Sequence, residues 1–381
     1  MRLGDCGKTN LHTYSDKEKW SLIRYLDTGS ITEGRIDEIQ TLYPGVDKIP
    51  SRARRKASVG DILFSTVRPN QKHYGIIEAG TENLLVSTGF TVVTVDTTIA
   101  DPYFIYYYLT QSSVIESLQA IAEQSTSTYP SIKPSDIEDI ELDLPELETQ
   151  KKIGSTLRML DRKIALNEEI NDNLADLLQT IYQERFGNDI LAVNQGVLSD
   201  ICSYSRDKVA VSELNVRTYF STENMLSGKA GSTEATSLPT TSQTTACHKG
   251  DTLISNIRPY FKKIVYCEDK CGCSTDVLCF TPSQPRYSAY LFSTLYADKF
   301  FAFMVAGSKG TKMPRGDKQQ IMTYPVVLPS EEELAGFNTI ASPLLEQIYS
   351  NRAENKRLSV LRDTLLPKLM SGEINVSAVQ L

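Results

Sequence analysis

Two long stretches of the chain place their apolar residues at alternating steps of three and four, the spacing of helices that pack side by side. One stretch follows Pro145 and the other follows Pro329, and each begins with glutamates, which favour the positive end of a helix dipole. Each predicts a helix of about 40 residues, roughly 60 Å long. The heptad residues are Ile153, Leu157, Leu160, Ile164, Asn167, Leu174, Leu344, Ile348, Asn351 and Leu358.

The two heptad stripes match, so the simplest way to bury them is against each other. A chain made of two equal halves favours a pseudo-two-fold relation, which makes the helix pair antiparallel. Asn167 and Asn351 fall near the helix middles, where buried polar residues can fix the register. Arg362 occupies a heptad position in the second helix, and Leu361 can replace it there. Pro343 should kink or locally break this helix.

The rest of the chain repeats itself. Residues 60–69 and 250–259 are identical at six of ten positions, and both contain Gly-Asp, Ser and Arg-Pro at the same places. Ser-Thr recurs at 87–88 and 274–275, and Leu-Pro recurs at 144–145 and 328–329. The chain therefore consists of two copies of one long unit.

Short β-rich runs punctuated by turn residues fill both copies before their long helices, with strands expected over 61–67, 90–95, 252–257 and 276–281. Each copy also predicts one helix, near 102–122 and 286–306. The fold class is therefore α+β: two globular mixed α/β domains in a pseudo-two-fold arrangement, separated by two long antiparallel coiled-coil helices. The expected segments are domain 1 (1–145), helix 1 (146–187), domain 2 (188–329) and helix 2 (330–381).

Composition narrows the function classes. The apolar fraction of 40% and charged fraction of 23% are those of a globular protein and not of a disordered chain. No run of 18 apolar residues suggests a membrane helix, and the N-terminus lacks the apolar core of a signal peptide, so a soluble cytoplasmic protein is expected. Seven cysteines, an odd number, argue against a disulfide framework.

The formal charge of −7 argues against a polycation, but local basic runs remain compatible with nucleic-acid binding. They occur over 51–72, 258–270 and 309–318, near glycines and hydroxyl residues that suit phosphate and base contacts. Such runs are equally typical of solvated loops. The candidate DNA-binding residues are Arg52, Arg54, Arg55, Arg68, Lys72, His73, Ser125, Tyr129, Lys133, Arg258, Lys262, Lys309, Lys312 and Arg315.

Tests for built-in chemistry are negative. The chain lacks the glycine-rich loop and the Asn/Asp-Pro-Pro-aromatic motif of an adenine methyltransferase, and Gly7-Lys8-Thr9 lacks the earlier glycine of a P-loop. The cysteines at 267, 271, 273 and 279, with Cys247 and His248 nearby, have poor zinc spacing and suit a sheet core. We therefore expect no catalytic residues, no cofactor and no metal.

The duplicated Gly-Asp-x-Leu-x-Ser-x-x-Arg-Pro motif, the two Ser-Thr pairs and the Leu-Pro-Glu-Leu-Glu-Thr-Gln entry at 144–150 together resemble the specificity subunit of a type I restriction-modification system. The resemblance covers nearly the whole chain. It implies that each globular domain is a target recognition domain for one part of a split sequence in double-stranded DNA. It also implies that the helices set the gap between the two parts of the target and bind two methylation subunits. Restriction subunits are possible further partners, and no association with a membrane is expected.

The sequence allows more than one role for the repeated arginines and more than one function for the chain. Arg68 and Arg258 recur in both copies, which favours one shared role, either to hold a turn by a salt bridge to Asp61 or Asp251 or to contact a phosphate. Base readout should lie where the copies differ, as in 70–74, 125–133 and 309–318. For the whole chain, the rivals are a stand-alone two-headed site-specific DNA-binding protein and a coiled-coil adaptor whose domains bind protein.

Overall fold

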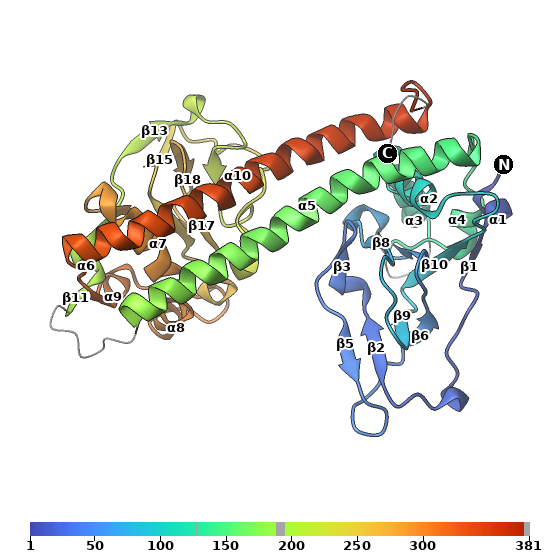
Figure 1. Ribbon diagram of the computed structural model, residues 1–381, viewed down its shortest axis with the longest axis horizontal. Helices are drawn as coiled ribbons and strands as arrows, with labels where there is room; N and C mark the ends of the chain where they lie inside the picture. Colours follow the sequence, from blue (N-terminus) through green and yellow to red (C-terminus); the bar gives the residue numbers. More distant parts are fainter. Residues whose placement is uncertain (126–128, 188–194, 377–381) are drawn as a thin grey trace. The chain divides into compact units, whose positions relative to one another are not determined.

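The computed structural model describes residues 1–125, 129–187 and 195–376. The chain forms two compact units, each with a globular part and one portion of two long helices, α5 (Leu147–Tyr182) and α10 (Glu331–Met370) (Figure 1). Unit 1 comprises Met1–Ala165 and Asn355–Leu381, and unit 2 comprises Leu166–Glu354. The expected domain boundary at 188, residues 126–128 of one candidate loop and residues 377–381 lie outside the described residues.

Unit 1 contains two four-stranded sheets. The first has the order β1 (Gly7–Thr9), β10 (Phe90–Val95), β7 (Ile62–Ser65), β8 (Tyr74–Ile76). The second has the order β5 (Gln40–Leu42), β2 (Ile23–Leu26), β9 (Leu84–Ser87), β6 (Ala53–Lys56). The remaining elements are the pair β3 (Ile31–Thr32) and β4 (Arg35–Ile36), and the helices α1 (Leu3–Cys6), α2 (Pro102–Leu109), α3 (Ser112–Glu123) and α4 (Pro134–Glu138).

Unit 2 repeats this plan. Its first sheet has the order β12 (Cys202–Tyr204), β19 (Val277–Pro282), β16 (Thr252–Ser255), β17 (Ile264–Tyr266). Its second sheet has the order β13 (Lys208–Ala210), β15 (Gln243–Cys247), β18 (Cys271–Cys273), β14 (Tyr219–Phe220). The remaining elements are the pair β11 (Gln195–Val197) and β20 (Pro325–Val327), and the helices α6 (Leu198–Ile201), α7 (Ser288–Tyr296), α8 (Asp298–Ala306) and α9 (Lys318–Ile321).

The two units share their first sheet and differ at an edge of the second. In both first sheets, the strand of the Gly-Asp repeat is central and pairs antiparallel with both neighbours. In both second sheets, a parallel pair (β2 with β9, β14 with β18) is followed by an antiparallel strand. Unit 1 then adds β5 beside β2, whereas unit 2 adds β13 beside β15. Loops at these edges are therefore specific to each unit.

The layers of unit 1 follow from the side-chain alternation along its strands. Ile62 and Phe64 of β7 face the helices and join the core that contains Phe104, whereas Leu63 faces the second sheet. A further small cluster with Tyr14 and Trp20 covers the outer face of the second sheet. In unit 2, Ile254 and Leu253 divide in the same way between the helix side and the inter-sheet side.

The repeated Gly-Asp motif starts the central strand of each first sheet. Gly60 and Gly250 have φ of 89° and 91°, a backbone conformation that favours glycine. The next residue then caps its own turn: Asp61 accepts the backbone N–H of Ser58 at 2.7 Å, and Asp251 accepts that of His248 at 2.8 Å. Both aspartates are buried, so the motif is part of the scaffold.

The single helix expected after each sheet region is two helices. Gln111 separates α2 from α3, and Ala297 separates α7 from α8, each with extended backbone at ψ of 139°. The reason is the pattern of burial. α2 buries five of its eight residues, whereas α3 buries Ile115, Leu118 and Ala122 on one face only, and one straight helix cannot present both surfaces to the core.

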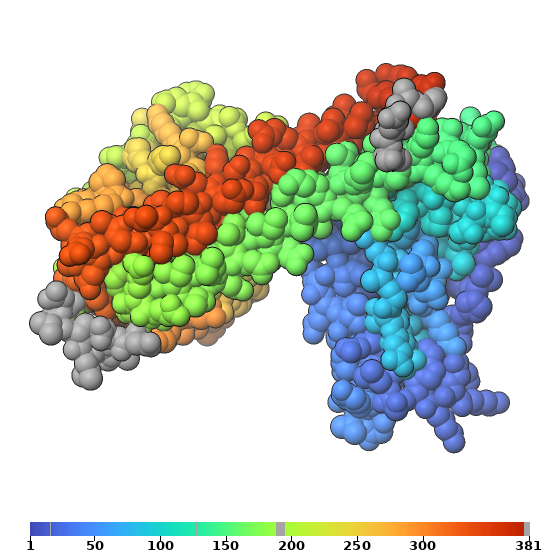
Figure 2. Space-filling view, in the orientation of Figure 1, coloured from blue at the N-terminus to red at the C-terminus, as the bar shows by residue number. Residues whose placement is uncertain are grey.

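α5 and α10 run antiparallel to each other within each unit (Figure 1). In unit 1, the Arg362 guanidinium donates to Asp161 at 2.8 Å, and Asn355 donates to the carbonyl oxygen of Ile164 at 3.2 Å. In unit 2, Asn351 donates to Asn171 at 2.9 Å, and Asn167 donates to Glu354 at 2.7 Å. Figure 2 shows the two helices of unit 2 in continuous side-chain contact.

The heptad residues are buried to different degrees. Five are fully buried in their own unit, and Leu160, Ile164, Leu174, Leu344 and Leu358 are half-buried. The fully buried ones are Ile153, Leu157, Asn167, Ile348 and Asn351.

Two expectations about the second helix are wrong. Leu361 is 46% exposed and does not replace Arg362, which turns toward Asp161. The break expected at Pro343 does not occur either: α10 is continuous from Glu331 to Met370. Packing of Phe337, Ala341 and Leu345, all buried in unit 2, holds the helix across the proline.

Five of the seven cysteines lie between the two sheets of unit 2, where they act as small apolar residues. Cys267 and Cys271 have their sulfurs 3.6 Å apart. Among the described residues, no group of three or more His, Cys, Asp or Glu side chains is placed to hold a metal ion. Within the same residues, no helix is both long and apolar enough to cross a bilayer.

Candidate nucleic-acid interface

Each unit presents its Arg-Pro repeat as a tight turn with the same backbone. Arg68 has φ of 48° and precedes a short 3-10 helix over Pro69–Gln71, while Arg258 has φ of 50° and precedes one over Pro259–Phe261. The lysines that end these turns, Lys72 and Lys262, are also left-handed, at 57° and 51°. Non-glycine residues rarely adopt this conformation, so its fourfold recurrence marks a specified shape.

A later segment of the chain is fixed to each turn. The Arg68 N–H donates to the carbonyl oxygen of Pro130 at 3.0 Å, and the Arg258 N–H donates to that of Pro314 at 2.8 Å. Isolated bridges continue the contact between Val67 and Ser131, and between Ile257 and Arg315. The basic runs and the loops expected to read bases are therefore adjacent in each unit, although they are more than 50 residues apart in sequence.

In unit 1, the side chains of the turn divide between solvent and scaffold. Arg68 is exposed and lies over the ring of Tyr129, 5.2 Å from its centre. Lys72 forms an ion pair with Glu33. His73 is held through Nδ1 at 2.7 Å from the carbonyl oxygen of Ile31. The Arg68 side chain is therefore accessible to a ligand, whereas His73 serves the scaffold.

The other unit 1 candidates occupy two places. Lys133 is exposed at the start of α4, and the Ser125 hydroxyl accepts the Ser131 N–H at 3.3 Å, which shapes the loop. The three arginines lie on or beside β6, in the second sheet, so the basic run 51–72 is distributed over both sheets. Arg52 is exposed, Arg54 is half-buried, and Arg55 donates to Asn10 while burial lowers its pKa.

In unit 2, the 309–318 loop is held by its own charges. Lys309 and Arg315 exchange two backbone hydrogen bonds of 2.9 Å, Lys309 pairs with Asp317 at 2.6 Å, and Arg315 pairs with Asp276 at 2.9 Å. Lys312 at the tip is exposed, and no described residue forms an ion pair with it. Lys312 is therefore the basic residue of this loop that is most accessible to a phosphate.

A lysine pair was not anticipated from the sequence. Asp298 at the start of α8 accepts from Lys262 at 2.9 Å and from Lys229 at 2.7 Å. Both lysines lower the pKa of Asp298, Lys229 most of all, so the carboxylate stays ionised. Lys229 comes from a turn nearly 30 residues before the Arg-Pro motif, and no local pattern relates it to Lys262.

The structure bears on one of the two roles expected for the repeated arginines, the salt bridge to Asp61 or Asp251. Asp61 and Asp251 are occupied by their own turns, and among the described residues no ion pair joins Arg68 to Asp61 or Arg258 to Asp251. The Arg258 Nε atom is buried without a hydrogen-bond partner in the described residues. Among the described residues, neither arginine therefore pairs with the aspartate of its own motif; Arg68 is exposed, whereas Arg258 is half-buried.

Comparisons with known proteins point to one class of protein. A model of the type I restriction modification DNA specificity domain matches residues 53–175. The chain is 28% identical over 209 residues to the HindI specificity subunit of Haemophilus influenzae, an alignment that covers 55% of this chain. It is 23% identical over 378 residues to the MjaIX specificity subunit of Methanocaldococcus jannaschii, covering 83% of this chain. The chain spans 45% of the length of the first relative and 78% of the second.

A solved structure shares the fold. The crystal structure of the type I restriction-modification S subunit from M. genitalium aligns with a TM-score of 0.55 at 18% identity, over 97% of this chain and 95% of that one. The domain match, the two relatives and the shared fold point the same way. Residues 53–175 thus match a type I restriction modification DNA specificity domain, and the chain is similar to type I specificity subunits over a longer stretch.

Proposed function

We propose that the chain is the DNA-recognition subunit of a type I restriction-modification complex and reads a bipartite target in double-stranded DNA. The observation that carries the proposal is the twice-built surface: in each unit, a left-handed Arg-Pro turn is hydrogen-bonded to a second loop with exposed basic side chains. The framework is the same and the loop side chains differ, as expected for two modules that read different sequences on one duplex.

In the proposed architecture, residues 1–145 and 188–329 are two recognition domains in a pseudo-two-fold arrangement. Residues 146–187 and 330–381 are the two spacer helices. The antiparallel pairing of α5 and α10 inside each unit supports it. In this role the chain is not catalytic, and the partner methylation subunits supply the adenine chemistry. The complex is cytoplasmic, since its substrate is cellular or incoming DNA.

An exposed apolar stripe supports docking of two methylation subunits, with restriction subunits as further partners where the system includes them. In unit 2, Leu166, Ile170 and Leu177 of α5 are 50%, 37% and 47% exposed. They are spaced four and seven residues apart, so they lie on one face of the helix. This stripe is separate from the buried heptad residues Asn167, Asn171 and Leu178. A second apolar face on a paired helix is typical of a helix that binds another subunit.

Methylome sequencing tests the proposed function. Deleting the gene of this chain is expected to abolish adenine methylation at one bipartite motif while every other motif persists, because sequence choice resides in this subunit. Re-expressing the chain should restore the same motif. An unchanged methylome would refute the role. Tight binding to one duplex without any methylation partner would favour the stand-alone DNA-binding protein instead.

Substituting Lys312 with alanine is expected to weaken DNA binding and to lower the slope of log K against log salt by about 0.9, the value of one phosphate contact. Lys309→Ala should change the slope less, because Lys309 is already paired with Asp317. Lys208→Ala on β13, outside the loop, is the matched control. Fluorescence anisotropy of a labelled target duplex at several salt concentrations measures all three. Equal slopes for wild type and Lys312→Ala would remove the 309–318 loop from the interface.

A further inference from the structure

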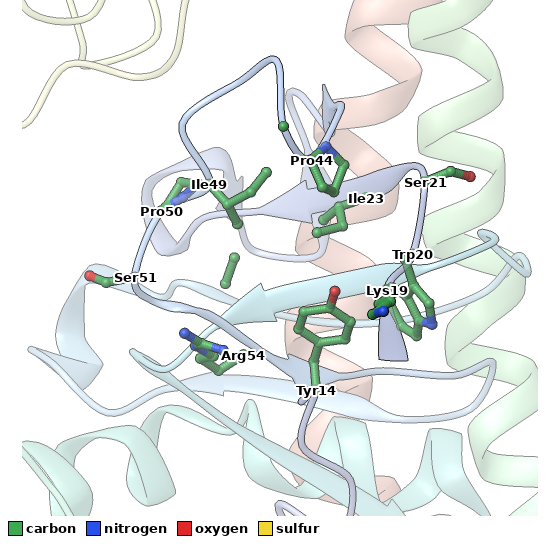
Figure 3. A pocket seen from close by; sticks show the side chains of 12 residues that line it. Tyr14, Lys19, Trp20, Ser21, Ile23, Pro44, Ile49, Pro50, Ser51 and Arg54 are labelled. Carbon is green, nitrogen blue, oxygen red and sulfur yellow. The ribbon is translucent and has the colours of Figure 1, made fainter. Parts of the chain in front are cut away.

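A cavity of about 570 Å³ opens on the outer face of the second sheet of unit 1. Tyr14 and Trp20 form its aromatic wall, with ring centres 4.7 Å apart and planes inclined by 47°. Ile23 of β2 and the loop residues Pro44 and Ile49 complete the apolar lining. Figure 3 shows the Tyr14 hydroxyl directed into this space, with Trp20 at one side and Arg54 at the other.

Two of the described residues that line the cavity carry a positive charge. Lys19 and Arg54 are among the lining residues, and none of the described lining residues carries a carboxylate. Lys19 is exposed with φ of 49°, at the end of a 3-10 turn that Ser15 and Glu18 cap. Outside the lining, the Lys56 ammonium lies 5.2 Å from the centre of the Trp20 ring. An anionic ligand would therefore meet a complementary field.

The aromatic wall is attached to the strand that carries the arginines. The Tyr14 N–H donates to the carbonyl oxygen of Arg54 at 2.7 Å, so the segment before Trp20 runs beside β6. Only 8% of the Tyr14 surface is exposed, and the residue belongs to the small outer cluster with Ile23 and Ala53. The wall is thus held in place by contacts of the fold itself, and a largely pre-formed wall is typical of binding pockets.

The cavity is lined by a part of unit 1 that unit 2 builds differently. It uses the loop that follows β5, and β5 occupies an edge of the second sheet that unit 2 builds differently. The outer cluster of unit 2 contains Val209, Leu214 and Tyr219, and the neighbouring groove includes the acids Glu223 and Glu234.

A flat aromatic ring joined to a phosphate matches this combination of stacking walls and cationic rim. Every nucleobase has a face for stacking, and aromatic side chains bind unpaired bases in this way. A cavity of this size accommodates a nucleotide, since ligand pockets commonly measure about 300–1,000 Å³. A paired base inside a duplex could not enter, so the base has to be unpaired or turned out of the stack.

We propose that this cavity of unit 1 receives one unpaired base of a DNA strand, stacked on Trp20 and Tyr14, with its phosphates near Lys19 and Arg54. The inference rests on the proposed function for the choice of DNA. It adds a base-capturing site to unit 1, away from the Arg-Pro turn.

Intrinsic fluorescence reports on the site directly, because Trp20 is the sole tryptophan of the chain. The full chain is titrated with a single-stranded ten-nucleotide DNA, with the same sequence as a duplex, and with dAMP. The single strand is expected to quench Trp20 emission and to bind more tightly than dAMP, because its phosphate backbone adds contacts at the rim. Absence of quenching by the single strand, or equal affinity for dAMP, would overturn the assignment.

Substitutions make the test specific. Trp20→Ala is expected to weaken binding of the labelled single strand by about 5- to 150-fold, or about 1–3 kcal/mol for one stacked base. Trp20→Phe should retain most of the affinity, since it keeps a stacking face and controls for folding. Tyr43→Ala, which removes a 53% exposed aromatic ring outside the lining, should change nothing.

The outcomes separate this site from the function of the chain. An equal loss in Tyr43→Ala, or an equal loss in Trp20→Phe, would refute the cavity as the binding site. If the methylome test succeeds and Trp20 does not respond, only the base-binding site fails. If gene deletion leaves the methylome unchanged, the proposed function fails whatever the fluorescence shows.

Discussion

Replacing Phe337 with alanine is expected to lower the free energy of unfolding by about 3–5 kcal/mol. Phe337 is fully buried in unit 2, where α10, the end of α5 and α7 meet. Its ring lies 5.4 Å from that of Phe186, 6.3 Å from Tyr182 and 6.4 Å from Tyr290. Removing it leaves a cavity among rigid rings that cannot collapse, which places the cost at the upper end for a large-to-small substitution.

Urea denaturation followed by circular dichroism measures this loss, and hydrogen exchange assigns it to unit 2. Ile340→Ala is the matched control, because Ile340 lies on the same helix and is 38% exposed. It should cost about 1 kcal/mol or less. Phe337→Leu should fall between the two. Equal losses for Phe337→Ala and Ile340→Ala would show that α10 is not anchored by this cluster.

Replacing Arg362 with alanine is expected to cost roughly 2–3 kcal/mol, less than the 3–5 kcal/mol for breaking a fully buried pair. Arg362 donates to Asp161 Oδ1 at 2.8 Å, and the Tyr107 hydroxyl donates to Asp161 Oδ2 at 2.6 Å. The Arg362 and Asp161 side chains are 24% and 32% exposed, so solvent weakens the interaction. Removing Arg362 leaves the half-buried carboxylate with the tyrosine alone.

A double-mutant cycle measures the pair. Asp161→Ala with Arg362→Ala should cost less than the sum of the single changes, because each single change leaves the other charge unpaired. Arg357→Ala, at an exposed position of α10, should have little effect. Additive losses would mean that Arg362 stabilises unit 1 through its aliphatic packing or its ion pair with Asp363 and not through Asp161. Both units would then owe their helix pairing to apolar contacts and amide hydrogen bonds.

The fold could be predicted where a local pattern repeats. The heptad spacing identified both long helices, and Ile153, Leu157 and Ile348 are buried as it requires. The strands that follow the Gly-Asp motif were also predicted correctly. A glycine at positive φ followed by a capping aspartate forms a turn that depends on neighbouring residues only. The prediction of a break at Pro343 was wrong, since packing on both sides of the proline outweighs its local cost.

The candidate interface could be predicted only in part. Arg68 and Lys312 were identified as basic residues, and the structure places both in solvent. The same reasoning included His73, whose ring is held by the Ile31 carbonyl, and Arg55, which is held by Asn10. The presence of a basic residue in a sequence does not reveal which group its side chain contacts in the folded chain. Lys229 was missed for the same reason, because its link to Lys262 passes through Asp298.

The amino-acid sequence alone reveals the repeated unit, the heptad helix that ends each copy, and the loops in which basic residues gather. These properties are local or periodic, so they can be read along the chain. Two features become visible only in the folded chain: Pro130 and Pro314 contact the Arg-Pro turns, and Tyr14, Trp20 and the loop after β5 line a cavity. Those contacts join segments that meet only after the sheets have formed, and which side chains then remain in solvent depends on the partners they find there.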